Sequence, residues 1–206
     1  MRSEETKRSI IAAAEKLFQE RGYEAVTIRE IAKEAGCSHT TIYIYFQDKE
    51  ALLHALSMEP LQQLKAKLDV LVADAFLSTD DKLLRLNAQF IQFCLHYKSM
   101  YSIIFEAKSV LNDEEEAELP FHRLLNQMFN IIVQLLGTQL NLSEGEQLLN
   151  CSRIYFYMLR GIVGTYSNSE ESVESIMGRL SITFDHAFEA LMLGFSIQLQ
   201  DRRKER

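Results

Sequence analysis

Residues that break helices are scarce in this chain, which has only two prolines and eight glycines among 206 residues. Glycine and proline are the residues that helix interiors tolerate least, so their scarcity allows long helices. Few segments alternate apolar with polar residues, as a half-buried strand would. The sequence therefore predicts an all-α protein with about nine helices, long enough to bury a substantial core.

Composition excludes several classes of protein. No run of about 18 apolar residues occurs, so we expect no membrane-spanning helix and no membrane partner. The polar segment Met1–Glu5 does not lead into an apolar stretch, which argues against a secretory signal and favours a cytoplasmic protein. Cys37, Cys94 and Cys151 form no CxxC pair, so we expect reduced thiols and neither a metal nor a cofactor.

Charge is distributed unevenly along the chain. The net charge of −7 argues against a protein that coats nucleic acid through bulk positive charge. Residues 1–50 are nearly neutral, with eight Lys/Arg and nine Asp/Glu, whereas the other 156 residues hold 14 Lys/Arg and 20 Asp/Glu. Any DNA-binding surface is therefore expected near the N-terminus.

A helix-turn-helix is predicted within residues 1–47. After a first helix over residues 4–21, Thr27 and Glu30 have the spacing of a capping box, which opens a second helix. Gly36 ends that helix, and Ser38 caps a short third helix over residues 38–46. The third helix of such an arrangement can lie in the major groove of DNA.

Several side chains in this region suit contacts with DNA. Ile42 and Phe46 are spaced to face the core, so the other side of the third helix is expected to be exposed. That side can hydrogen-bond base edges and touch thymine methyl groups through His39, Thr40, Tyr43 and Ile44. Groups suited to phosphates are Thr27 at a helix start, Lys49, and the hydroxyl of Tyr43 or Tyr45.

Residues 9–53 resemble the DNA-binding domain of the tetracycline-repressor (TetR) family. The matching pieces are Arg21-Gly22-Tyr23, Thr27-Ile28 with Ile31-Ala32, Ala35-Gly36 with Ser38, Thr41-Ile42-Tyr43 with Phe46, and Lys49-Glu50-Ala51-Leu52. The resemblance implies that Arg29 and Thr41 touch bases and that Thr27, Tyr43 and Lys49 touch phosphates. The sequence departs from the family pattern at Thr40 and Ile44. Because both residues lie on the expected base-reading side of the third helix, the family pattern does not indicate which operator sequence is bound.

The rest of the chain, residues 48–206, is predicted to form a second helical domain. A long fourth helix begins after Asp48, carries the boundary between the domains, and is expected to kink or break at Pro60. Pro120 suits the first position of a helix, and Ser143 and Glu146 predict another capping box. The expected helices cover residues 78–97, 100–108, 120–136, 143–166 and 173–199, with an acidic loop at 112–118 and a frayed tail at 201–206.

Aromatic and sulfur-containing residues in this second domain suggest a ligand pocket. Any one of them is more readily explained as a core residue, but together they suit an apolar or aromatic ligand. The candidates are Phe90, Cys94, Tyr97, Tyr101, Phe105, Met128, Phe129, Tyr155 and Met158.

The resemblance also implies a homodimer in which the last two helices of each protomer form a four-helix bundle with the same helices of the other protomer. The helix at 148–166 is apolar on two faces, which requires a core on one side and a partner on the other. Two-fold symmetry places two recognition helices roughly 34–36 Å apart, so the operator is expected to be a near-palindrome.

The expected function is that of a repressor that a small-molecule effector releases from its DNA operator. An activator or an effector-free regulator of the same fold is the first alternative. A helical enzyme is disfavoured because no nucleophile–base pair, phosphate loop or metal motif occurs. An adaptor that binds only protein is disfavoured by the hydroxyl-rich start of the third helix.

Overall fold

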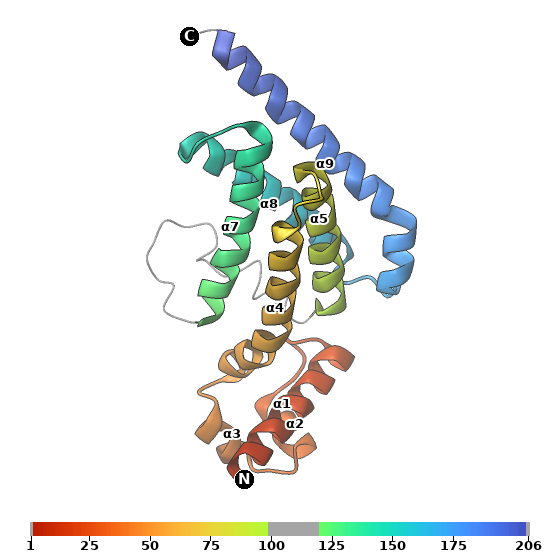
Figure 1. Cartoon of the computed structure of the whole chain (residues 1–206). Helices are drawn as coiled ribbons and strands as arrows, with labels where there is room; N and C mark the ends of the chain where they lie inside the picture. The colour runs from red at the N-terminus through yellow and green to blue at the C-terminus, as the bar shows by residue number, and fades with distance from the viewer. Residues whose placement is uncertain (1, 99–119, 205–206) are drawn as a thin grey trace. The chain divides into compact units, whose positions relative to one another are not determined.

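The computed structural model describes residues 2–98 and 120–204, and within these ranges it contains eight helices and no strand (Figure 1). The prediction of an all-α protein is therefore confirmed. No helix among the described residues is both long and apolar enough to cross a lipid bilayer. The helices are α1 (Arg2–Arg21), α2 (Ile28–Glu34), α3 (His39–Tyr45), α4 (Lys49–Ala73), α5 (Thr79–His96), α7 (Pro120–Leu140), α8 (Glu146–Tyr166) and α9 (Val173–Lys204).

Backbone contacts divide the chain into two compact units, and the division falls inside α4, between Gln63 and Leu64. The first unit contains α1 to α3 and the beginning of α4. The second contains the end of α4 together with α5, α7, α8 and α9. The predicted functional domains, residues 1–47 and 48–206, remain a prediction.

Apolar residues at helical spacing form the core of the first unit. On α1, Ile10, Ala14 and Phe18 recur every four residues and are buried. Gly22 then ends α1 with a positive φ of 79°, which a residue without a side chain adopts at little cost, and its N–H donates to the carbonyl of Phe18. Tyr23 follows at once and packs edge-on against Phe18, with ring centroids 5.2 Å apart.

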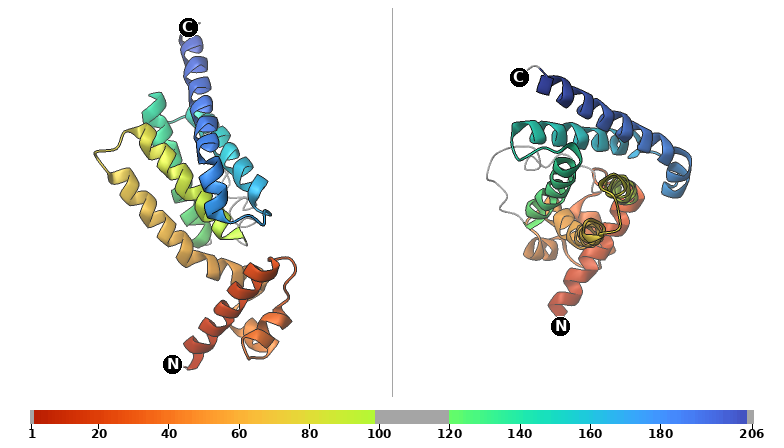
Figure 2. Two further views of the ribbon diagram at one scale, coloured as in Figure 1. Left: turned by 90° about the vertical axis from the view of Figure 1, so that its right-hand side faces the viewer. Right: turned by 45° about the horizontal axis from the view of Figure 1, so that its top comes forward.

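Tyr155 lies at the centre of the second unit, in which α5 packs against α7, α8 and α9. Its side chain is fully buried on α8, and its ring centroid lies 4.8 Å from that of Phe188 on α9. Its hydroxyl donates a hydrogen bond of 2.9 Å to the side-chain oxygen of Asn87 on α5. The last turns of α9 extend beyond the other helices of this unit (Figure 2).

Some predicted helix ends are wrong. A kink or a break was predicted at Pro60, and the break does not occur, because α4 continues through the proline with Leu56, Leu61 and Leu64 buried around it. The burial of these side chains offsets the hydrogen bond that the proline cannot donate.

The predicted capping box at Ser143 and Glu146 is also wrong. The N-cap of α8 is Gly145, which has a φ of 151° and makes no side-chain capping bond. The helix therefore begins at Glu146, after Gly145, and not directly after Ser143 as predicted. The frayed tail was mispredicted as well, since α9 reaches Lys204 through residues that favour helix. The predicted helix at 100–108 and the acidic loop at 112–118 lie outside the described residues.

Candidate nucleic-acid interface

The start of α2 is held by the predicted capping box. The Thr27 hydroxyl accepts from the Glu30 N–H at 3.3 Å, and the Thr27 N–H donates to the Glu30 carboxylate at 2.9 Å. The Thr27 hydroxyl also donates to that carboxylate at 2.7 Å, and Arg21 donates to its other oxygen at 2.8 Å. These bonds fix the direction in which α2 leaves the preceding loop.

The turn between α2 and α3 is held by a glycine and a second cap. Gly36 has a φ of 68°, and the Ser38 hydroxyl accepts from the N–H of Thr41 at 3.0 Å. On the inner side of α3, Ile42 and Phe46 are buried. Capped at its start and anchored by these apolar side chains, α3 presents its opposite side to solvent.

The outward side of α3 carries the predicted base-reading residues. Tyr43 is 53% exposed and Ile44 is 75% exposed, and His39 and Thr40 are exposed as well. A large apolar side chain such as that of Ile44 gains nothing from facing water, so its position favours an external partner. The structure thus brings His39, Thr40, Tyr43 and Ile44 together on one surface.

Arg29 lies exposed on α2. It makes no hydrogen bond or ion pair with any residue in the described ranges, because Glu30, its neighbour, pairs with Arg21 instead. A guanidinium group without an internal partner can bind a base edge or a phosphate.

Three other candidates are engaged within the first unit. Tyr45 donates its hydroxyl to Ser3 at 3.2 Å, and the Thr41 hydroxyl lies 2.8 Å from that of Ser38. The hydroxyl of Thr27 belongs to the capping box. These contacts position the helices, and the roles of these residues toward DNA remain predictions.

Lys49 joins the start of α4 to the loop between α1 and α2. Its ammonium donates to the carbonyls of Tyr23 and Val26 at 2.9 and 3.1 Å and lies 4.0 Å from the centre of the Tyr23 ring. These contacts explain a cation at a helix start without requiring a phosphate. An ammonium has three donors, so one stays available for a phosphate. This structural role was missed because its partners are distant in sequence.

The capping box makes the stability of the first unit depend on pH. Hydrogen bonds from Thr27 and Arg21 hold the pKa of Glu30 at about 2, below its ordinary value of 4.5. A depressed pKa means that this stabilisation is complete above pH 4.5 and is lost as the pH falls toward 2. We expect Glu30→Gln to lower the melting temperature more at about pH 6 than at about pH 3. Circular dichroism checks this, and an equal decrease at both pH values contradicts it.

Most of the predicted ligand-pocket residues prove to be core residues. Phe90, Cys94, Met128 and Phe129 are buried in the second unit, and burial raises the pKa of the Cys94 thiol. Tyr97 and Met158 are half-buried. Tyr101 and Phe105 lie outside the described residues.

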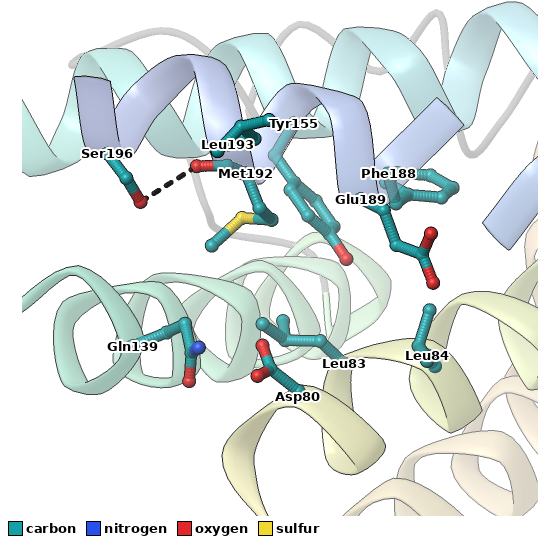
Figure 3. Close-up of a pocket in the computed structure, with 10 residues that line it drawn as sticks. All are labelled: Asp80, Leu83, Leu84, Gln139, Tyr155, Phe188, Glu189, Met192, Leu193 and Ser196. Carbon is teal, nitrogen blue, oxygen red and sulfur yellow. Dashed lines mark hydrogen bonds between the residues drawn. The ribbon is translucent and has the colours of Figure 1, made fainter. Parts of the chain in front are cut away.

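Tyr155 alone among the described candidates lines the cavity of about 360 Å³ that lies in the second unit (Figure 3). The other lining residues come from α5, α7 and α9, and periodicity could not reveal that they meet. They are Asp80, Leu83, Leu84, Gln139, Phe188, Glu189, Met192, Leu193 and Ser196.

Comparisons with known proteins agree with this geometry. Residues 10–56 match the family described as "Bacterial regulatory proteins, tetR family". The HTH-type transcriptional regulator YerO of Bacillus subtilis is 27% identical over 166 residues, which are 80% of this chain and 55% of YerO. The chain thus spans about half the length of that relative.

Solved structures share the fold across both units. A TetR/AcrR-family transcriptional regulator from Thermobifida fusca has a TM-score of 0.60 at 18% identity and covers 87% of this chain and 96% of its own. The transcriptional regulator FadR from Bacillus subtilis, solved in complex with stearoyl-CoA, has a TM-score of 0.58 at 20% identity and covers 86% of this chain and 96% of its own.

The capped α2, the glycine turn and the exposed α3 form a helix-turn-helix. The relatives and solved structures that this chain resembles are described as transcriptional regulators. Within the chain, residues 10–56 match the TetR family of bacterial regulatory proteins, which agrees with the resemblance found in the sequence.

Proposed function

We propose that the protein is a dimeric transcription repressor that reads a near-palindromic DNA operator with α3 of each protomer. A small molecule bound in the second unit releases it from the operator. The observation that carries this proposal is the outward side of α3, where Tyr43 and Ile44 are exposed although the helix itself is firmly anchored by Ile42 and Phe46.

Selection from a random pool of double-stranded DNA tests the DNA-binding part. We expect a near-palindromic sequence to be enriched and its affinity to fall steeply as salt increases, because phosphate contacts release counterions. Weak binding without sequence enrichment would overturn the proposal.

The outer face of α8 and α9 supports a homodimer. Large apolar side chains are exposed on both helices, and a groove of about 430 Å³ lined by Cys151, Phe195 and Leu199 lies between them. A second copy of the same two helices would bury these exposed apolar side chains. The exposed residues are Ile154, Tyr157, Ile182, Leu193 and Ile197.

Charges placed on this face are expected to separate the protomers. Tyr157→Glu combined with Ile197→Glu puts carboxylates into a surface that pairs with itself, so each charge faces apolar surface or a like charge. We expect sedimentation to show a dimer for the unmodified protein and a monomer for the double variant. Val70→Glu is the matched control, because Val70 is also a large exposed apolar residue, at 73% against 51% for Tyr157 and Ile197, but lies on α4. An unchanged dimer in the double variant contradicts this interface.

The cavity beside Tyr155 favours a ligand-responsive regulator over an effector-free one. Its volume of about 360 Å³ is within the range of small-molecule sites. FadR, which shares the fold, was solved in complex with stearoyl-CoA, which supports a small-molecule ligand for a protein of this fold. Release then requires the ligand to bind the DNA-free arrangement more tightly than the DNA-bound one.

A further inference from the structure

The cavity beside Tyr155 combines an apolar wall with two carboxylates. The apolar part consists of Leu83, Leu84, Phe188, Met192 and Leu193, together with the Tyr155 ring. Asp80 from the first turn of α5 and Glu189 from α9 supply the carboxylates. None of the ten lining residues is Lys, Arg or His.

Neither carboxylate has a cationic partner. Across the described ranges, the side chains of Asp80 and Glu189 make no hydrogen bond and no ion pair with protein. Figure 3 shows the side chains of Asp80 on α5 and Glu189 on α9 on opposite sides of the Tyr155 hydroxyl. Because that hydroxyl donates its proton to Asn87, its oxygen stays free to accept a hydrogen bond from a ligand.

The surroundings of the cavity add negative charge. Burial raises the pKa of Tyr155, and the charges of Asp185 and Asp80 raise it further, whereas the hydrogen bond that its hydroxyl donates to Asn87 lowers it. Burial also raises the pKa of Asp185, as does Glu189, whereas His186 lowers it. Because Asp80 and Glu189 line the cavity and no cationic residue does, its potential is negative, which attracts a cation and repels an anion.

We infer that this cavity binds an organic cation with an apolar or aromatic body. The positive charge lies between Asp80 and Glu189, and the body packs against Tyr155, Phe188 and Met192. A cation beside aromatic rings gains from their negative faces as well as from the carboxylates. This inference rests on the proposed ligand-responsive function and names the class of its effector. It excludes an acyl-CoA from this cavity, because phosphates would face two carboxylates.

Two ions of the same shape and opposite charge test the inference. We expect isothermal titration of the full chain with tetraphenylphosphonium to show saturable binding with one site per protomer, and tetraphenylborate to show none. Asp80→Asn with Glu189→Gln is expected to weaken tetraphenylphosphonium binding about tenfold or more. Glu174→Gln, an exposed carboxylate on α9 outside the cavity, is the matched control and should bind as the unmodified protein does.

The failures of the inference and of the proposed function can be told apart. Equal binding of both ions, or full binding by the double variant, overturns the cation site. The single variant Glu189→Gln keeps the test valid if Asp80→Asn weakens the start of α5. Operator binding is measured separately with and without tetraphenylphosphonium. Saturable binding of the cation that leaves operator affinity unchanged supports the site and overturns release by this ligand.

Discussion

Replacing Tyr43 by alanine is expected to reduce operator affinity about tenfold to hundredfold, the cost of losing about 1–3 kcal/mol of base or phosphate contact. Tyr43 is 53% exposed and makes no contact that holds α3 in place, so the fold should be unchanged. Fluorescence anisotropy with the selected operator measures the affinity, and circular dichroism checks the fold.

Two further variants sharpen this experiment. Tyr43→Phe removes only the hydroxyl, so it separates a phosphate contact through oxygen from packing of the ring on a base. Gln19→Ala changes an exposed neutral residue on α1 and should bind the operator normally. Unchanged affinity in a folded Tyr43→Ala protein would exclude α3 as the reading helix.

Replacing Phe18 by alanine is expected to destabilise the first unit by about 3–5 kcal/mol. Phe18 is 2% exposed, and its ring packs edge-on against Tyr23, so truncation leaves a cavity between α1 and the following loop. Denaturant unfolding followed by circular dichroism measures the loss. Hydrogen exchange of the amides in α1 to α3 assigns it to this unit, because exchange reports the stability of each part of the chain.

A phenylalanine elsewhere in the chain provides the control. Phe76 is 99% exposed, so Phe76→Ala removes no buried surface and should change the free energy of unfolding by less than about 0.5 kcal/mol. If both variants lose the same stability, burial of Phe18 is not the source of the effect. Weakened operator binding by Phe18→Ala is also expected, since α3 is anchored in the same small core.

The sequence alone determined the features that depend on near neighbours. The caps at Thr27 and Ser38 were predictable because their bonds join residues three positions apart. Gly22 and Gly36 end helices through their own backbone conformation, and spacing identified Ile42 and Phe46 as the inner side of α3. Local chemistry therefore predicted the helix-turn-helix and its exposed residues, and with them the match of residues 10–56 to the TetR family.

Local spacing failed where a neighbouring residue or the surrounding packing prevailed. Ser143 and Glu146 have the spacing of a capping box, yet Gly145 starts α8. Pro60 lacks a helical hydrogen bond, yet α4 continues because the leucines around it are buried. At the start of α8 the conformation of Gly145 prevailed over the spacing of a capping box. In α4 the burial of the surrounding leucines prevailed over the tendency of proline to end a helix.

Only the tertiary structure decided which distant side chains meet. It showed that Lys49 binds carbonyls more than twenty residues away, and that Tyr155 donates to Asn87 on another helix. It also gathered Asp80 and Glu189 around one cavity and left most of the predicted pocket residues in the core. Periodicity identifies the buried face of a helix, but the packing of helices against one another determines where that face leaves an open space.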